Sequence, residues 1–306
     1  MIETPVDVLQ KHPIRKNKKQ KQAFRDAVQA YAEGLGCSVT TEQGKRGCRN
    51  LIIGDPETAQ YWVTAHYDTP AALWGPNLTM PCNGLMFALC QMVNAVMLMF
   101  PALLIWGGVF WKTWNLLYAH GSLLAAVLVI VLLIFCGPAN RHNANNNTSG
   151  VVTLLEMVSS MPPRLRSRVC FVLFDKEEMG QTGSTCFYKA HKEAAGKKTV
   201  VNLNCVGDGD TLMLFPSEQM RSEPWLLALE RPLGPKEIKI AHRNFCDSGL
   251  DPQYYPRSVS VMALRRGKLG YWLGRTHTRR DKILDRTNIN ILRACLISYI
   301  GSHTAE

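Results

Sequence analysis

Acidic and histidine side chains that could do chemistry follow short apolar runs at three places in the sequence. They are His66, Asp68, Glu177, Glu178 and His277. Imidazole nitrogen and carboxylate oxygen are ligands that zinc accepts in protein sites that keep one position open for water. A metal in such a site lowers the pKa of the water and polarises a carbonyl group, so these residue types indicate metal-assisted hydrolysis.

Each of these residues also has an ordinary structural interpretation. A single histidine after a strand is more often a hydrogen-bonded structural residue than a ligand, and Asp175, Glu177 and Glu178 could belong to a solvated loop. Asp68 favours the functional interpretation of His66, because a nearby carboxylate fixes the tautomer of an imidazole and raises its basicity.

Five short motifs surround these residues, and taken in order they resemble the M28 family of zinc-dependent aminopeptidases and related exopeptidases. The motifs are A-H-x-D ending at Asp68, N-A-x-x-N-x-S-G ending at Gly150, F-D-x-E-E-x-G-x-x-G-S ending at Ser184, N-L-x-x-V-G ending at Gly207 and T-H-T-x-x-D ending at Asp281. The resemblance covers most of the sequence outside its apolar segment. It implies a zinc-dependent exopeptidase that removes N-terminal residues from peptides.

The resemblance also implies roles for single residues. Glu178 and His277 would hold one zinc, His66 would hold a second, and Glu177 would be the general base, with Asp68 the other catalytic residue. We expect both glutamates at the end of the strand at 169–174, where neighbouring side chains point in different directions. One could then ligate the metal while the other faces the water.

Two positions depart from the family pattern. Asn146 stands where the family has the aspartate that bridges the metals, and Asn204 stands where it has an aspartate ligand of the second zinc. Each change replaces a charged oxygen ligand by a neutral amide, which weakens the second metal most. Two hypotheses therefore stay open: a zinc aminopeptidase with one or two zinc ions, and a pseudopeptidase that binds peptides or a membrane partner.

Two long apolar runs, at 84–111 and 116–136, interrupt the motifs. About 20 apolar residues of helix cross the roughly 30 Å hydrocarbon core, so the runs predict a transmembrane helical hairpin. Aromatic residues of the membrane-interface type gather at its turn: Trp106, Trp111, Trp114 and Tyr118. The alternatives are two buried core helices, a re-entrant hairpin kinked at Pro101, and a transporter, which draws on the hairpin alone.

The hairpin divides the chain into three parts. Residues 1–83 form the first part of a peptidase-like domain, residues 84–136 the hairpin, and residues 137–306 the second part with most of the motifs. A hairpin returns the chain to the side it left, so the two soluble parts can join. The alternation of strand and helix patterns favours an α/β fold, a three-layer αβα domain with a mixed sheet.

The chain is basic, with 35 Lys and Arg against 24 Asp and Glu, and it shows no nucleic-acid-binding motif. A lipid bilayer is therefore an expected partner, and the resemblance implies a peptide substrate. The basic segment 11–21 is expected to be a solvated face that attracts anionic lipid. Ten scattered cysteines and the lack of a signal-peptide pattern favour a cytoplasmic catalytic domain. We expect substrate recognition at residues 243–255; the sequence does not indicate an oligomeric state.

Overall fold

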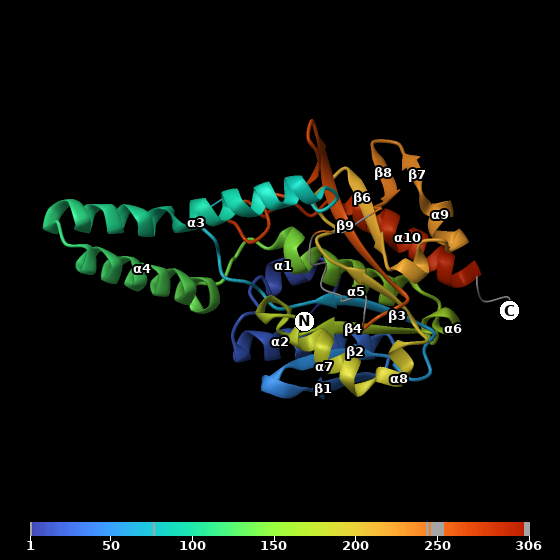
Figure 1. The fold of residues 1–306 in the computed structure, drawn as a ribbon. Coiled ribbons are helices and arrows are strands. Elements are labelled where there is room, and N and C mark those ends of the chain that lie inside the picture. Colours follow the sequence, from blue (N-terminus) through green and yellow to red (C-terminus); the bar gives the residue numbers. More distant parts are fainter. Residues whose placement is uncertain (1, 76, 243–244, 246–253, 303–306) are drawn as a thin grey trace.

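The protein is built around one ten-stranded mixed sheet. The computed structural model of the chain describes residues 2–75, 77–242, 245 and 254–302 (Figure 1). The strand order is β1-β2-β4-β3-β5-β9-β6-β8-β7, and β10 pairs with β9. The strands are β1 Val39–Gln43, β2 Arg49–Ile53, β3 Tyr61–His66, β4 Val169–Phe174, β5 Thr199–Leu203, β6 Thr211–Pro216, β7 Arg231–Leu233, β8 Lys236–Ile240, β9 Ser258–Gly267 and β10 Gly270–Trp272. The four central strands β4, β3, β5 and β9 are parallel, and antiparallel pairs flank them on both sides.

Helices cover both faces of this sheet, which confirms the predicted three-layer arrangement. Strand β4 shows why: Phe171 and Leu173 pack into one core cluster, whereas Val172 and Phe174 pack into another. Because side chains alternate along a strand, a strand that is apolar at every position needs a layer on each face. The first layer contains α2 Lys18–Gly34, α5 Gly150–Ser160, α9 Pro224–Leu229 and α10 Arg286–Ser302; the second contains α7 Thr182–Ala190 and α8 Lys192–Ala195. The remaining short helices are α1 Asp7–Lys11 and α6 Pro163–Arg166.

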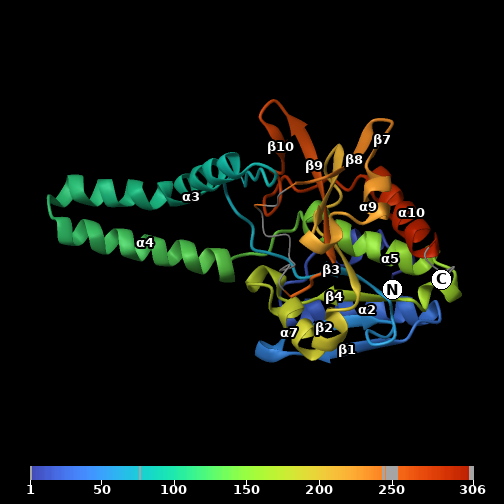
Figure 2. The same cartoon turned by 45° about the vertical axis from the view of Figure 1, so that its right-hand side comes forward.

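The predicted hairpin is present as two antiparallel helices that project from the domain (Figures 1 and 2). They are α3 Gly84–Thr113 and α4 Leu116–Cys136, and α3 continues unbroken through Pro101. Both are apolar enough to cross a membrane, yet only 6% of the apolar window of α3 and 11% of that of α4 is buried. The alternative of two buried core helices is therefore wrong.

The basic N-terminal segment is a solvated face only in part: Lys11, Lys18 and Lys19 are exposed, whereas Arg15 and Lys21 are not. The side chain of Arg15 is completely buried, and its guanidinium donates hydrogen bonds to the backbone oxygen of Tyr67 (2.6 Å) and to Oδ1 of Asn147 (2.6 Å). Lys21 is buried too, and its Nζ lies 2.5 Å from Oδ1 of Asp175. The segment ties the N-terminus to the centre of the domain, and Asp175 is a buried ion-pair partner instead of a solvated loop residue.

Candidate active site

The motifs meet at one edge of the sheet. Parallel strands β3, β4 and β5 end at His66, Phe174 and Leu203, so the segments that follow them emerge side by side. The C-terminal ends of parallel strands are where open α/β sheets bind ligands. The structure thus brings the sequence-predicted residues to a common place.

A loop of asparagines, residues 143–149, forms the centre of this edge and is held from two sides. The buried carboxylate of Asp281 accepts hydrogen bonds from the backbone N–H groups of Asn145 (2.7 Å) and Asn146 (2.9 Å). Oδ1 of Asn145 accepts one from the backbone N–H of Gly207 (2.7 Å). These bonds connect the second, fourth and fifth motifs.

Asp68 positions the two glutamates. Its oxygens accept hydrogen bonds from the backbone N–H groups of Glu177 (3.0 Å) and Glu178 (3.2 Å), which lie on a turn of 3₁₀ helix at Glu177–Met179. The expected place of the glutamates on strand β4 is therefore wrong: the strand ends at Phe174, and Lys176 reverses the chain with a φ of 57°. The carboxylate of Asp68 fixes this turn by satisfying backbone donors that have no partner inside it.

The same carboxylate lies beside His66. Oδ1 of Asp68 is 3.4 Å from Nδ1 of His66, and both side chains are buried. Within the described part of the chain, that ring nitrogen has no hydrogen-bond partner. Asp68 thus lies close to His66, as the sequence predicts, but its hydrogen bonds go to the glutamate turn.

Glu178 is the centre of the charged network. Its Oε1 lies 3.3 Å from Nε2 of His277 and accepts a hydrogen bond of 2.7 Å from the side-chain amide of Asn146. Burial alone would raise the pKa of Glu178, but the neighbouring His277 lowers it to about 2. Burial likewise lowers the pKa of His277, and Glu178 more than offsets this and raises it. The two side chains form a half-buried ion pair that Asn146 completes.

Cys205 is a site residue that the motifs did not reveal. Its Sγ lies 3.3 Å from Oδ1 of Asn146 and 3.1 Å from Oδ1 of Asn204, and its one thiol proton is shared between these acceptors, so it connects the two positions that depart from the family pattern. Cys205 has a φ of 54°, which turns its side chain toward the asparagine loop. The only sequence signal was its place beside Asn204 in the fourth motif, because its other neighbour in space, Asn146, comes from the second motif.

The spacing of Glu178 and His277 fits two ligands of one zinc ion. Two atoms that are each about 2.0 Å from a tetrahedral zinc lie about 3.3 Å apart, as Oε1 and Nε2 do here. The neighbouring third donor is the neutral amide of Asn146. Among the residues that the structure describes, no group of three or more His, Cys, Asp or Glu side chains could hold one metal ion.

The residues present do not fit a second zinc ion. His66 would be its imidazole ligand, and the other two ligands would be Asn146 and Asn204. Both of these side chains are neutral, and both present their Oδ1 atoms to the Cys205 thiol. The paired-metal site implied by the resemblance is therefore reduced to one carboxylate and one imidazole, Glu178 and His277, at one position.

The mixed sheet, its two helical layers and a site at the ends of its parallel strands define an α/β domain of the exopeptidase type. The chain belongs to peptidase family M28, whose family profile matches residues 131–284. No curated protein sequence shows significant similarity to the chain.

Solved structures of both aminopeptidases and glutaminyl cyclases resemble the protein. Glutaminyl cyclase from Porphyromonas gingivalis is 16% identical with a TM-score of 0.58, and the match covers 99% of this chain and 98% of that one. The LapA aminopeptidase of Legionella pneumophila is 12% identical with a TM-score of 0.58, over 99% and 72%. A leucine aminopeptidase precursor from Bacteroides thetaiotaomicron is 13% identical with a TM-score of 0.55, over 97% and 96%. At these identities the likeness shows the fold and does not choose between the two reactions.

The segment expected to recognise substrate, residues 243–255, lies outside the described residues except for Phe245, Tyr254 and Tyr255. Tyr255 is buried and donates a hydrogen bond to the backbone oxygen of Ser184 (2.9 Å), next to the glutamate turn. This part of the expectation stays a prediction.

Proposed function

We propose that this protein is a membrane-anchored member of the M28 family that binds the amino-terminal end of peptides and has lost the paired-zinc chemistry of hydrolysis. The hydrogen bond from the amide of Asn146 to Oε1 of Glu178 carries the proposal. It places an N–H donor where the family has a carboxylate that bridges two cations. Glu178 is thereby satisfied by the chain's own residues.

Metal binding at this position competes with an ion pair. To hold a zinc ion, His277 would have to be deprotonated, although Glu178 raises its pKa, and the Asn146 amide would have to turn away from Oε1 of Glu178. Metal ligands have to be deprotonated, so the raised pKa of His277 works against binding near neutral pH. With one carboxylate and one imidazole instead of three strong protein ligands, we expect zinc to bind weakly.

The remaining charge of the site suits an ammonium group. The charge of Glu178 is balanced by His277, and the carboxylate of Asp68 is taken up by two backbone N–H groups. Glu177 lies on the same turn, where it is half-buried and accepts a hydrogen bond from the hydroxyl of Ser184 (3.4 Å). The free amino terminus of a peptide carries the charge that Glu177 attracts, and a hydrogen bond between ionised groups is about twice as strong as a neutral one.

Zinc content and peptide binding on one detergent-purified sample test the proposal. We expect less than one zinc per chain by elemental analysis, no turnover of aminoacyl substrates, and binding of a tripeptide that acetylation of its amino group abolishes. Glu177→Gln should weaken this binding about tenfold or more. The control is Glu193→Gln, which makes the same change at an exposed residue of α8. Equal binding of the free and acetylated peptides would refute the proposal.

A zinc aminopeptidase with a single metal is the second candidate, and the 3.3 Å between Glu178 and His277 favours it. In that case Glu178, His277 and the Asn146 oxygen would hold the ion, which would supply polarisation of the scissile carbonyl. Glu177 would take the proton of the attacking water and pass it to the leaving amine. About one zinc per chain with chelator-sensitive turnover, lost in Glu177→Gln while zinc remains, would establish this candidate instead.

Anchorage in a lipid bilayer by α3 and α4, with the domain on the cytoplasmic side, completes the proposal. Basic residues near the inner ends of the helices support this orientation. Lys16 donates a hydrogen bond to the backbone oxygen of Gly137 (2.7 Å) at the end of α4, and exposed Arg141 follows, against the single Lys112 at the outer turn. Cytoplasmic flanks of membrane helices carry an excess of Lys and Arg. A cysteine introduced at Thr113 tests the orientation. Its labelling by a reagent added outside intact cells would support the orientation, and labelling only after lysis would overturn it.

A further inference from the structure

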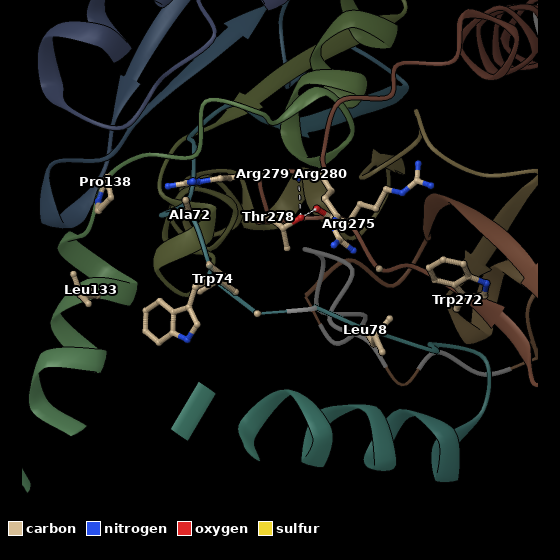
Figure 3. Close-up of a pocket in the computed structure, with 13 residues that line it drawn as sticks. Ala72, Trp74, Leu78, Leu133, Pro138, Trp272, Arg275, Thr278, Arg279 and Arg280 are labelled. Atoms are coloured by element: carbon tan, nitrogen blue, oxygen red, sulfur yellow. Dashed lines mark hydrogen bonds between the residues drawn. The ribbon is translucent and has the colours of Figure 1, made fainter. Parts of the chain in front are cut away.

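A cavity of about 950 Å³ lies at the base of the hairpin (Figure 3). Thr278, which follows His277 of the candidate active site, is one of its lining residues. Its floor and sides are apolar and aromatic, with Trp74, Leu133 and Trp272 among them. On the other side, the loop that follows His277 contributes Arg279 and Arg280. The cavity therefore combines an apolar wall from the hairpin region with a basic wall from the domain.

A second, apolar cavity of about 580 Å³ opens beside it, in the groove between α3 and α4. Ala102, Ala126 and Val129 are among the small and apolar residues that line it. Trp74 and Leu133 line both cavities, so the groove and the basic cavity adjoin each other. Together they offer one apolar compartment and one cationic compartment in contact.

The basic wall carries more positive charge than the acidic side chains of the described residues balance. Arg275 lies 3.4 Å from Asp208, which also pairs with Arg265. Arg279 and Arg280 are exposed, and no acidic side chain in the described part of the chain pairs with either of them. Guanidinium groups on one wall of a cavity attract an anion with several acceptor oxygens, such as a phosphate.

The basic cavity lies at the level where a bilayer surface is expected. The side chain of Asn94 accepts a hydrogen bond from the backbone N–H of Leu78 (3.0 Å) and donates one to its backbone oxygen (2.8 Å), so α3 is tied to the domain up to this point. The free part of α3, residues 95–113, is about 28 Å long, and α4 is about 32 Å long. Both lengths match the roughly 30 Å hydrocarbon core, whose inner boundary then lies beside Trp74 and the arginines.

We propose that one anionic phospholipid occupies both cavities, with an acyl chain in the groove between α3 and α4 and its phosphate on Arg279 and Arg280. Basic pockets beside membrane helices bind anionic headgroups in this way. The proposal rests on the proposed membrane anchorage. It also connects the lipid to the candidate site, because the backbone N–H of Leu73, in the cavity wall, donates to the backbone oxygen of His277 (2.8 Å).

Native mass spectrometry of the whole protein, released from nanodiscs of phosphatidylcholine with phosphatidylglycerol, tests the proposal. We expect one retained phosphatidylglycerol per chain. The double variant Arg279→Gln and Arg280→Gln should bind it about 30-fold more weakly, since each charge near an anionic bilayer is equivalent to about fivefold. The control is Lys112→Gln at the outer turn, which also removes a positive charge and should retain the lipid. Equal retention by the double variant and the control would overturn the proposal.

A second variant tests the groove without touching the arginines. Ala126→Phe fills the space between α3 and α4, so we expect this variant to lose the bound lipid. Glycerol phosphate has no acyl chain and should still bind weakly to the arginines of the variant. If glycerol phosphate displaces bound phosphatidylglycerol as efficiently as added phosphatidylglycerol does, the site binds free phosphate compounds and the lipid assignment fails. Flotation with liposomes separates the two proposals: a chain that does not float refutes the anchorage, whereas one that floats without selective retention refutes the lipid site alone.

Discussion

Replacement of Asn146 by aspartate tests the central contact of the site. The change turns a hydrogen bond of 2.7 Å to Oε1 of Glu178 into a contact between two carboxylates. At an effective dielectric constant of about 20, two unit charges at this distance repel each other by about 6 kcal/mol. Proton uptake limits the cost, because protonating a carboxyl of ordinary pKa at pH 7 requires about 4 kcal/mol.

We therefore expect zinc-free Asn146→Asp to lose about 2 to 4 kcal/mol of unfolding free energy at pH 7, and to recover part of it at pH 5, where a shared proton is easier to hold. Zinc should reverse the loss, since a cation between the two carboxylates replaces the missing proton. A free zinc concentration of about 100 times Kd contributes about 2.7 kcal/mol. Thermal unfolding in detergent, with chelator and then with buffered zinc, measures both effects.

The matched control is Asn204→Asp. It makes the same chemical change at a half-buried residue whose side chain contacts the Cys205 thiol and no carboxylate among the described residues. We expect its zinc-free stability to change by less than about 1 kcal/mol. The reasoning is refuted if the two single variants lose equal stability without zinc, or if zinc does not restore Asn146→Asp. The double variant should bind the most zinc of the series.

Three further predictions concern other parts of the network. Arg15→Met should destabilise the protein by about 3 kcal/mol, because buried partners lose a charged donor, whereas Lys18→Met at the exposed start of α2 should be nearly neutral; urea unfolding compares them. The Glu178 and His277 pair should stabilise the fold fully between about pH 4.5 and 6.5, the ordinary pKa values of the two groups. This contribution should fall as the pH drops toward about 2, where Glu178 takes up a proton, and as it rises through the raised pKa of His277. His277→Gln should flatten that profile in thermal unfolding, and an unchanged profile would show that the pair does not couple to folding. Glu177→Gln should leave zinc content and melting temperature unchanged, and a loss of metal would show that Glu177 is a ligand.

Much of the sheet could be predicted from the sequence. The strand at 169–174 matches β4 residue for residue, because a run that is apolar at every position suits a strand covered on both faces. Strand β6 was not predicted: the run 212–215 is apolar, but it contains no β-branched residue that would separate a strand from a helix in so short a run. Its six pairs with β9, which are long-range contacts, decide its conformation.

The residues of the candidate site could be predicted from the sequence, but the contacts among them could not. The spacing of the motifs identified His66, Glu178 and His277, and the structure brings the motifs to one edge of the sheet. The roles of Arg15 and Cys205 could not be predicted, because their partners lie in other motifs and a basic run or a lone cysteine has many ordinary explanations. The bond between Asn146 and Glu178 is likewise a product of tertiary structure, since 31 residues separate the two positions in the chain.

The position of the hairpin in the chain has a consequence for how the protein is made. Strand β3 pairs in parallel with β4 and β5, and both of these are synthesised after α3 and α4. In the proposed membrane-anchored protein, β3 waits with both edges unpaired until the hairpin has entered the bilayer and the chain has returned. Unpaired edges are templates for aggregation, so insertion into the membrane becomes a step in the folding of the soluble domain. A mutation that slows insertion would then reduce the yield of the domain without touching one of its own residues.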